Sequence, residues 1–84
     1  MTGGRKTATQ VIKGRSDADA LMSRLDNTME CQGEIDVVAI GPKGLEEAVK
    51  GAVRHNLSVV DIDDRGNDTY VLHIVNRFGK KCRE

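Results

Sequence analysis

The sequence predicts one small α/β domain, a two-layer α+β sandwich with the element order βαβαββ. Three observations predict it. A chain of 84 residues has room for a single core, two stretches carry apolar residues at helical spacing, and short β-rich runs alternate with these stretches and then follow them. Right-handed crossovers make the first three strands parallel. The last strand follows a short turn and is antiparallel, so both helices cover one face of a four-stranded mixed sheet.

The first half of the chain supplies a strand and a helix. Residues 1–7 are expected to form a flexible arm, residues 8–76 the domain, and residues 8–13 the first strand. Ser16 is a candidate N-cap, and Gly33 is expected to end the first helix in a left-handed conformation. The apolar residues of this helix share one face: Ala18, Leu21, Met22, Leu25 and Met29.

The second half begins with a predicted strand at residues 34–40 and a predicted loop at residues 41–44. A second amphipathic helix follows, and Asn56 suits its left-handed cap. Residues 57–63 and 69–76 are predicted strands, joined by a tight turn that contains Gly66. Residues 77–84 are expected to be a basic, frayed tail. The second helix has its apolar face at Leu45, Ala48, Val49, Ala52 and Val53.

The net charge of zero conceals an uneven distribution. Residues 1–15 carry four basic residues and no acidic one, whereas residues 16–76 carry twelve acidic and five basic residues. Residues 77–84 carry four basic residues and one acidic residue. An acidic body with basic ends is therefore the pattern that a functional hypothesis has to explain.

The predicted topology brings both helix N-termini to one edge of the sheet. Lys13 and Arg15 precede the first helix and Lys43 precedes the second, so free backbone amides stand beside cations in an arrangement that binds anions. The alternative is that these cations only point to solvent. Four acidic residues in the first helical turns favour that alternative, because carboxylates repel phosphate: Asp17, Asp19, Glu46 and Glu47.

The opposite edge collects both chain termini. Basic tails contact nucleic acid through counterion release, although these residues also serve as solubilising termini. We expect Cys31 and Cys82, at the same edge, to remain thiols in a reducing compartment, while a disulfide between them is sterically conceivable. Six basic residues could converge at this edge: Arg5, Lys6, Arg77, Lys80, Lys81 and Arg83.

Catalytic and cofactor signals are weak. His55 suits a helix end and His73 a strand, and neither has a nucleophile at a readable spacing. The two histidines and two cysteines lack a metal-ligand spacing, so we expect no enzyme, no metal and no cofactor. No apolar stretch reaches the roughly 18–20 residues of a membrane span, and the polar N-terminus does not resemble a signal peptide. We therefore expect a cytoplasmic protein, or a nuclear one in a eukaryote.

A family resemblance lies in residues 33–50. Ala39-Ile40-Gly41 and Ala48-Val49-Lys50 resemble the stage V sporulation protein S family, which is similar in fold to the Alba chromatin and RNA-binding proteins. The resemblance implies a homodimer that binds DNA or RNA, with backbone contacts after the first strand, at Lys13 and Arg15, and before the second helix, at Lys43. Alba's long basic hairpin is not matched, because the hairpin here is short and acidic.

The leading hypothesis is a small non-catalytic, dimeric nucleic-acid-binding protein that contacts the backbone with modest affinity and without sequence specificity. Its phosphate contacts would come from Lys13, Arg15 and Lys43. Two aromatic residues are too few for the stacking platform of a single-strand binder. The alternative is a protein-interaction module that kept the fold without nucleic-acid binding. The auxiliary contacts of the leading hypothesis are Arg5, Lys6, Lys80 and Lys81.

Overall fold

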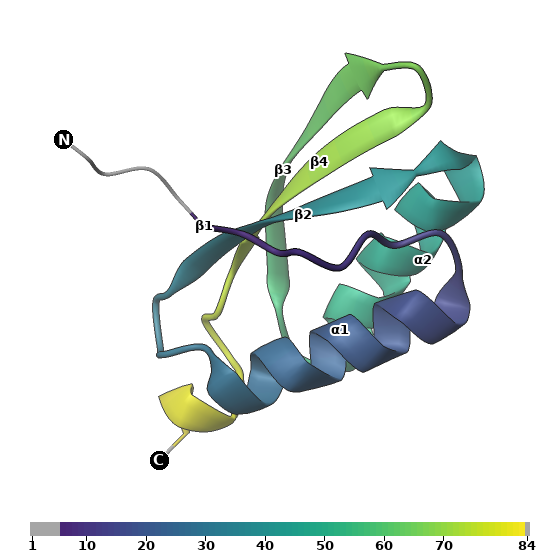
Figure 1. Cartoon of the computed structure of the whole chain (residues 1–84). Coiled ribbons are helices and arrows are strands. Elements are labelled where there is room, and N and C mark those ends of the chain that lie inside the picture. The colour runs from purple at the N-terminus through teal and green to yellow at the C-terminus, as the bar shows by residue number, and fades with distance from the viewer. Residues whose placement is uncertain (1–5, 84) are drawn as a thin grey trace, which may run out of the picture.

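Two helices cover one face of a four-stranded sheet in the computed structural model, which describes residues 6–83 (Figure 1). The strand order is β1-β2-β4-β3, with β1 parallel to β2 and β4 antiparallel to both of its neighbours. The predicted βαβαββ architecture is confirmed. The elements are β1 (Lys6–Thr7), α1 (Arg15–Thr28), β2 (Glu34–Ile40), α2 (Gly41–Arg54), β3 (Ser58–Gly66), β4 (Thr69–Val75) and the 3₁₀ helix η1 (Lys80–Cys82).

The first strand is shorter and earlier than the expected residues 8–13. After β1 the chain still follows β2, because the Ala8 amide donates to the Asp36 carbonyl at 2.8 Å and the Ile12 amide to the Val38 carbonyl at 2.9 Å. Between them Gln10 leaves the ladder, and its side chain accepts from Arg24 of α1 at 2.6 Å. The bonds of Gln10 to α1 therefore interrupt the strand. The remainder of the expected arm, residues 1–5, lies outside the described residues.

Both ends of α1 differ from expectation. The helix begins at Arg15 with Gly14 as N-cap, so Ser16 does not cap it. The Asp17 carboxylate instead accepts the Lys13 amide at 3.0 Å and closes the preceding turn. At the other end α1 stops at Thr28 with Met29 in an extended conformation, so Gly33 does not end the helix; the left-handed residue is Gln32, with φ of 69°, in the loop before β2.

The expected loop at residues 41–44 is the first turn of α2. Proline is tolerated in a first helical turn because its missing N–H would have no helical partner there. Gly44 is needed in this turn, since a Cβ there would lie 2.5 Å from the carbonyl oxygen of Ile12. The first turn of α2 therefore packs directly on the segment that precedes α1. At the helix end Asn56 adopts a φ of 63°, as predicted.

The β3–β4 hairpin is the tight turn that the sequence predicts. Gly66 pairs with Thr69, and the two residues between them, Asn67 and Asp68, both have positive φ, as in a type I′ turn. The Gly41 amide donates to the Asp68 carbonyl at 2.6 Å. This bond fixes the hairpin tip beside the start of α2.

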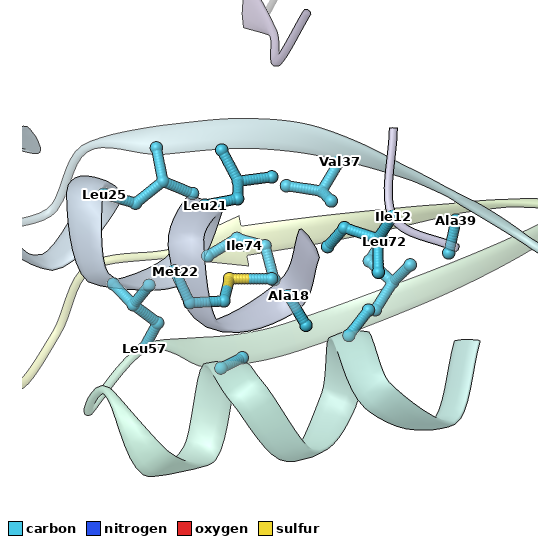
Figure 2. Close-up of a cluster of buried hydrophobic side chains, with 12 residues drawn as sticks. Ile12, Ala18, Leu21, Met22, Leu25, Val37, Ala39, Leu57, Leu72 and Ile74 are labelled. Carbon is cyan, nitrogen blue, oxygen red and sulfur yellow. The ribbon is translucent and has the colours of Figure 1, made fainter. Parts of the chain in front are cut away.

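The core lies between the helices and the sheet. Alternate residues of β2 and β4 face it, such as Val37 and Leu72, and the helical stripes predicted from periodicity meet them (Figure 2). Val53 is the exception, because it is 68% exposed although the prediction placed it on the apolar face of α2. No helix among residues 6–83 is long and apolar enough to cross a membrane. The buried core residues are Ile12, Ala18, Leu21, Met22, Leu25, Val37, Ala39, Ala48, Ala52, Leu57, Leu72 and Ile74.

The C-terminal tail is ordered through residue 83, contrary to the expectation of a frayed end. Residues 77–83, here called the C-terminal turn, contain η1 and lie beside the end of α1 (Figure 1). Cys82 forms a disulfide with Cys31, which follows α1. The expectation of two free thiols was therefore wrong. The residues that shape this turn, Asp26 and Asn76, are both buried.

Candidate nucleic-acid interface

The starts of both helices lie side by side, as the topology predicts. The Ile40 amide donates to the Ile12 carbonyl at 2.9 Å, and Gly44 packs against the same carbonyl. Residues 13–15 and 41–44, here called the helix-start edge, therefore bring Lys13, Arg15 and Lys43 to one end of the molecule. The hydrogen bond with Glu47 raises the pKa of Lys43, and the positive charge of Arg15 opposes that rise, as expected for neighbouring cations.

The cations of the helix-start edge differ in their partners. The Lys43 ammonium lies 2.9 Å from the carboxylate of Glu47, and Arg15 lies 3.6 Å from the carboxylate of Asp19. Within residues 6–83 the Lys13 ammonium has no ion pair, so it is the cation most available to an incoming phosphate. The sequence analysis placed Asp19 and Glu47 in the first helical turns; in the structure both lie beyond the first turn, and each pairs with one of the three cations.

Lys43 and Glu47 form a closer ion pair than Arg15 and Asp19 at this edge. The hydrogen bond from Lys43 holds the pKa of the Glu47 carboxyl below its ordinary value, and the same bond raises the pKa of Lys43. The Glu47 side chain is only 6% exposed, whereas that of Lys43 is 67% exposed. A phosphate that approaches Lys43 from solvent therefore has to compete with the carboxylate of Glu47 for the ammonium group.

Asp19 links the two helices. Its carboxylate accepts Arg54 of α2 at 2.7 Å and also lies near Arg15. The hydrogen bond from Arg54 lowers the pKa of Asp19. Because Asp19 already pairs with Arg54, it competes less strongly with an external anion for Arg15 than the count of acidic residues suggests.

The hairpin beside this edge is acidic. Its tip is bonded to Gly41, and Arg65 pairs with Asp63 within the same strand. The Asp64 carboxylate accepts the Gly66 amide at 2.9 Å and so stabilises the turn. The hairpin thus adds negative charge next to the helix-start edge, and its single arginine is already paired.

The expected auxiliary cations occupy separate places. Lys6 is in β1, opposite Ile35 of β2, and Arg5 lies outside the described residues. Lys80 and Lys81 are in η1, where the Lys80 ammonium donates to the Asn27 side chain at 2.8 Å and Lys81 lies 3.3 Å from Glu30. η1, which carries both lysines, therefore lies beside the end of α1 and not beside the helix starts (Figure 1).

Three buried polar residues shape the candidate surfaces. The sequence analysis named Glu47 as a carboxylate that opposes phosphate binding, and it missed Asp26 and Asn76. Glu47 neutralises Lys43, while Asp26 and Asn76 hold the C-terminal turn. The Asp26 carboxylate accepts the Lys80 backbone amide at 3.0 Å, and the side-chain Oδ1 of Asn76 accepts the Gly79 backbone amide at 2.9 Å. A signal for Asp26 exists in the sequence, because it directly follows Leu25 on the edge of the apolar stripe of α1.

His73 lies on the sheet face that the helices leave uncovered. Its Nε2 is 2.9 Å from a Glu34 carboxylate oxygen and its Nδ1 is 3.2 Å from Asp36. Within residues 6–83, no group of three histidine, cysteine or acidic side chains is arranged to hold a metal ion. The cluster is a set of cross-strand pairs, since Asp36 stands directly opposite His73.

No protein-family model matches the chain, and no curated protein matches it in sequence.

Proposed function

We propose that the protein is a small, non-catalytic, dimeric nucleic-acid-binding protein of the Alba type, related to the stage V sporulation protein S family. It binds the DNA or RNA backbone with modest affinity and little sequence preference. The observation that carries the proposal is the convergence of Lys13, Arg15 and Lys43 beside two adjacent helix starts. Helix N-termini with flanking cations favour phosphate.

The partners of these cations set the expected strength. Lys13 is unpaired within residues 6–83, whereas phosphate has to compete with Glu47 for Lys43. The acidic hairpin lies beside the same edge and repels a long duplex. Few phosphate contacts give weak binding and a shallow dependence on salt, because each contact releases about one counterion.

The proposed homodimer has apolar surface available to it. Val53 of α2 is 68% exposed and Ile62 of β3 is 45% exposed. Ile62 stands opposite the buried Leu72, so its side chain points to the face of the sheet that the helices cover. We propose that a second copy packs on this surface, and that Val53→Asp shifts the molecular mass measured by light scattering from dimer to monomer.

The first experiment is fluorescence anisotropy with labelled duplex DNA, single-stranded DNA and RNA, at low and at physiological salt. We expect micromolar binding that weakens as salt rises. Reversal of Lys13, Arg15 and Lys43 to glutamate should abolish it, and unchanged binding would contradict the proposal.

The second candidate function is a protein-interaction module, and the acidic hairpin favours it. A protein partner recovered in pull-downs that survive nuclease treatment, together with no binding to any nucleic acid at low salt, would replace the nucleic-acid proposal. We propose a cytoplasmic location for either activity. The Cys31–Cys82 disulfide argues against it, because such bonds are typical of oxidising compartments.

A further inference from the structure

Phe78 is an aromatic side chain held out into solvent. It is 65% exposed, whereas the other aromatic residue of the chain, Tyr70, packs against the core. Burial of a phenylalanine is strongly favourable, so an exposed phenylalanine ring is available to pack against a partner.

The backbone on both sides of Phe78 is anchored to the domain. Asn76 is fully buried; its side-chain Nδ2 donates to the Met29 carbonyl at 2.8 Å, and its side-chain Oδ1 accepts the Gly79 backbone amide. A Cβ at position 79 would lie 2.4 Å from that oxygen, so the close approach requires glycine. Cys82 then ties the end of the turn to Cys31. Phe78 therefore projects from a turn that is ordered before any ligand arrives.

Four basic residues flank this phenylalanine in the sequence, and most of their positive charge is available to an external anion. Arg77 has no ion pair within residues 6–83, and Arg83 donates to the Phe78 carbonyl at 2.8 Å. The Lys80 ammonium donates to the neutral side-chain amide of Asn27, so within residues 6–83 no carboxylate pairs with it. Lys81 faces the exposed carboxylate of Glu30 at 3.3 Å.

The nearby Asp26 carboxylate is buried and accepts the Lys80 amide. The C-terminal turn is therefore more positive towards solvent than the helix-start edge, where partly and fully buried carboxylates face two of the three cations.

We propose that the C-terminal turn is a stacking site for one unpaired base of a single-stranded nucleic acid. Phe78 stacks on the base, and Arg77, Lys80 and Arg83 bind the flanking phosphates. The inference rests on the proposed function and adds to it a second surface and a substrate class. A single strand fits because its bases are free to leave their neighbours, whereas duplex bases are stacked and paired.

A lipid surface fits less well. One exposed phenylalanine buries little apolar area, and a single weak apolar anchor gives only marginal membrane binding. A single stacked base, by contrast, needs only one ring and two or three cations, which is what this turn presents.

The test uses Phe78→Trp, which introduces the only tryptophan of the chain. Stacking of a base on the indole quenches its fluorescence, so titration with short oligothymidine or oligouridine at low salt should quench the signal strongly. The control is Val60→Trp, at an exposed position outside the proposed dimer surface and outside the C-terminal turn, and we expect no quenching there. Anisotropy should show that Phe78→Ala weakens single-strand binding about tenfold and leaves duplex binding unchanged. Because Phe78 is exposed, circular dichroism should show an unchanged fold.

The outcomes separate the two proposals. Single-strand binding without quenching in the Phe78→Trp variant, or equal binding by Phe78→Ala, would overturn the stacking site and leave the proposed function standing. Absence of binding to any nucleic acid at low salt would overturn both. If the indole fluorescence of the Phe78→Trp variant responded to anionic phospholipid vesicles but not to oligonucleotides, a membrane surface would replace the nucleic acid.

Discussion

At the residue scale, the pair between Lys43 and Glu47 sets how much positive charge α2 presents to a ligand. Glu47→Gln removes the competing carboxylate and keeps the shape of the side chain. We expect this variant to bind duplex DNA more tightly, with the slope of log K against log salt steeper by about one. Glu46→Gln is the matched control, because Glu46 pairs instead with Lys50 at 2.8 Å. Equal gains in both variants would show that net charge alone is responsible.

A second residue-scale prediction concerns Asp19 and pH. The hydrogen bond from Arg54 lowers the pKa of Asp19 in the folded state below its ordinary value of 3.8. A lowered folded-state pKa stabilises the fold above the unfolded-state value, and this stabilisation is lost as pH falls through the folded-state value. Thermal unfolding should therefore show a steeper loss of stability below about pH 4 in the wild type than in Asp19→Asn. Parallel curves for the two proteins would contradict the role assigned to this pair.

At the element scale, the contact between α2 and the segment before α1 depends on Gly44. A methyl group there meets the Ile12 carbonyl at 2.5 Å, and backbone atoms do not yield easily. We expect Gly44→Ala to reduce the free energy of unfolding by about 1–3 kcal/mol, in the range of overpacked sites. Gly14→Ala is the control, since nothing lies within 4 Å of a Cβ at that position. Chemical denaturation measures both.

The second prediction at the element scale concerns the C-terminal turn, which a disulfide fixes to the end of α1. Cys31 and Cys82 are separated by 51 residues, so their disulfide restricts a long loop of the unfolded chain. Reduction should lower the free energy of unfolding by about 2–4 kcal/mol and should speed hydrogen exchange at residues 79–83. The double variant Cys31→Ser/Cys82→Ser should match the reduced protein and should not respond to dithiothreitol. An identical stability of oxidised and reduced protein would contradict this account.

At the scale of the whole molecule, local patterns predicted the fold and long-range contacts determined the site. The spacing of Leu21, Met22 and Leu25 sufficed for α1, because helical periodicity is visible in sequence. The prediction of a loop at residues 41–44 was wrong. Proline is a loop signal in general, but Pro42 lies in a first helical turn, where proline is tolerated. The topology correctly brought Lys13 and Lys43 to one edge. It did not predict that buried Glu47 neutralises Lys43, because that pairing depends on how α2 is rotated against the core.

The C-terminal turn is likewise predicted only in part from the sequence. The topology placed Cys31 and Cys82 at one edge, but their pairing depends on Asp26 and Asn76 bonding the backbone of residues 79 and 80. The bond between Asp26 and Lys80 joins residues 54 positions apart, and a contact of this kind leaves no periodic signal in the sequence. The basic composition of this segment therefore indicated a frayed tail, although the fold orders it.

The most direct test of the central claim is duplex DNA binding by two charge-matched double variants. Lys13→Glu/Lys43→Glu alters the helix-start edge, and Arg24→Glu/Lys50→Glu makes the same change in net charge elsewhere on the helices. Anisotropy at low salt should show that the first variant loses binding and that the second keeps most of it. Equal losses in both variants, or undiminished binding by the first, would contradict the assignment of phosphate contacts to the helix-start edge.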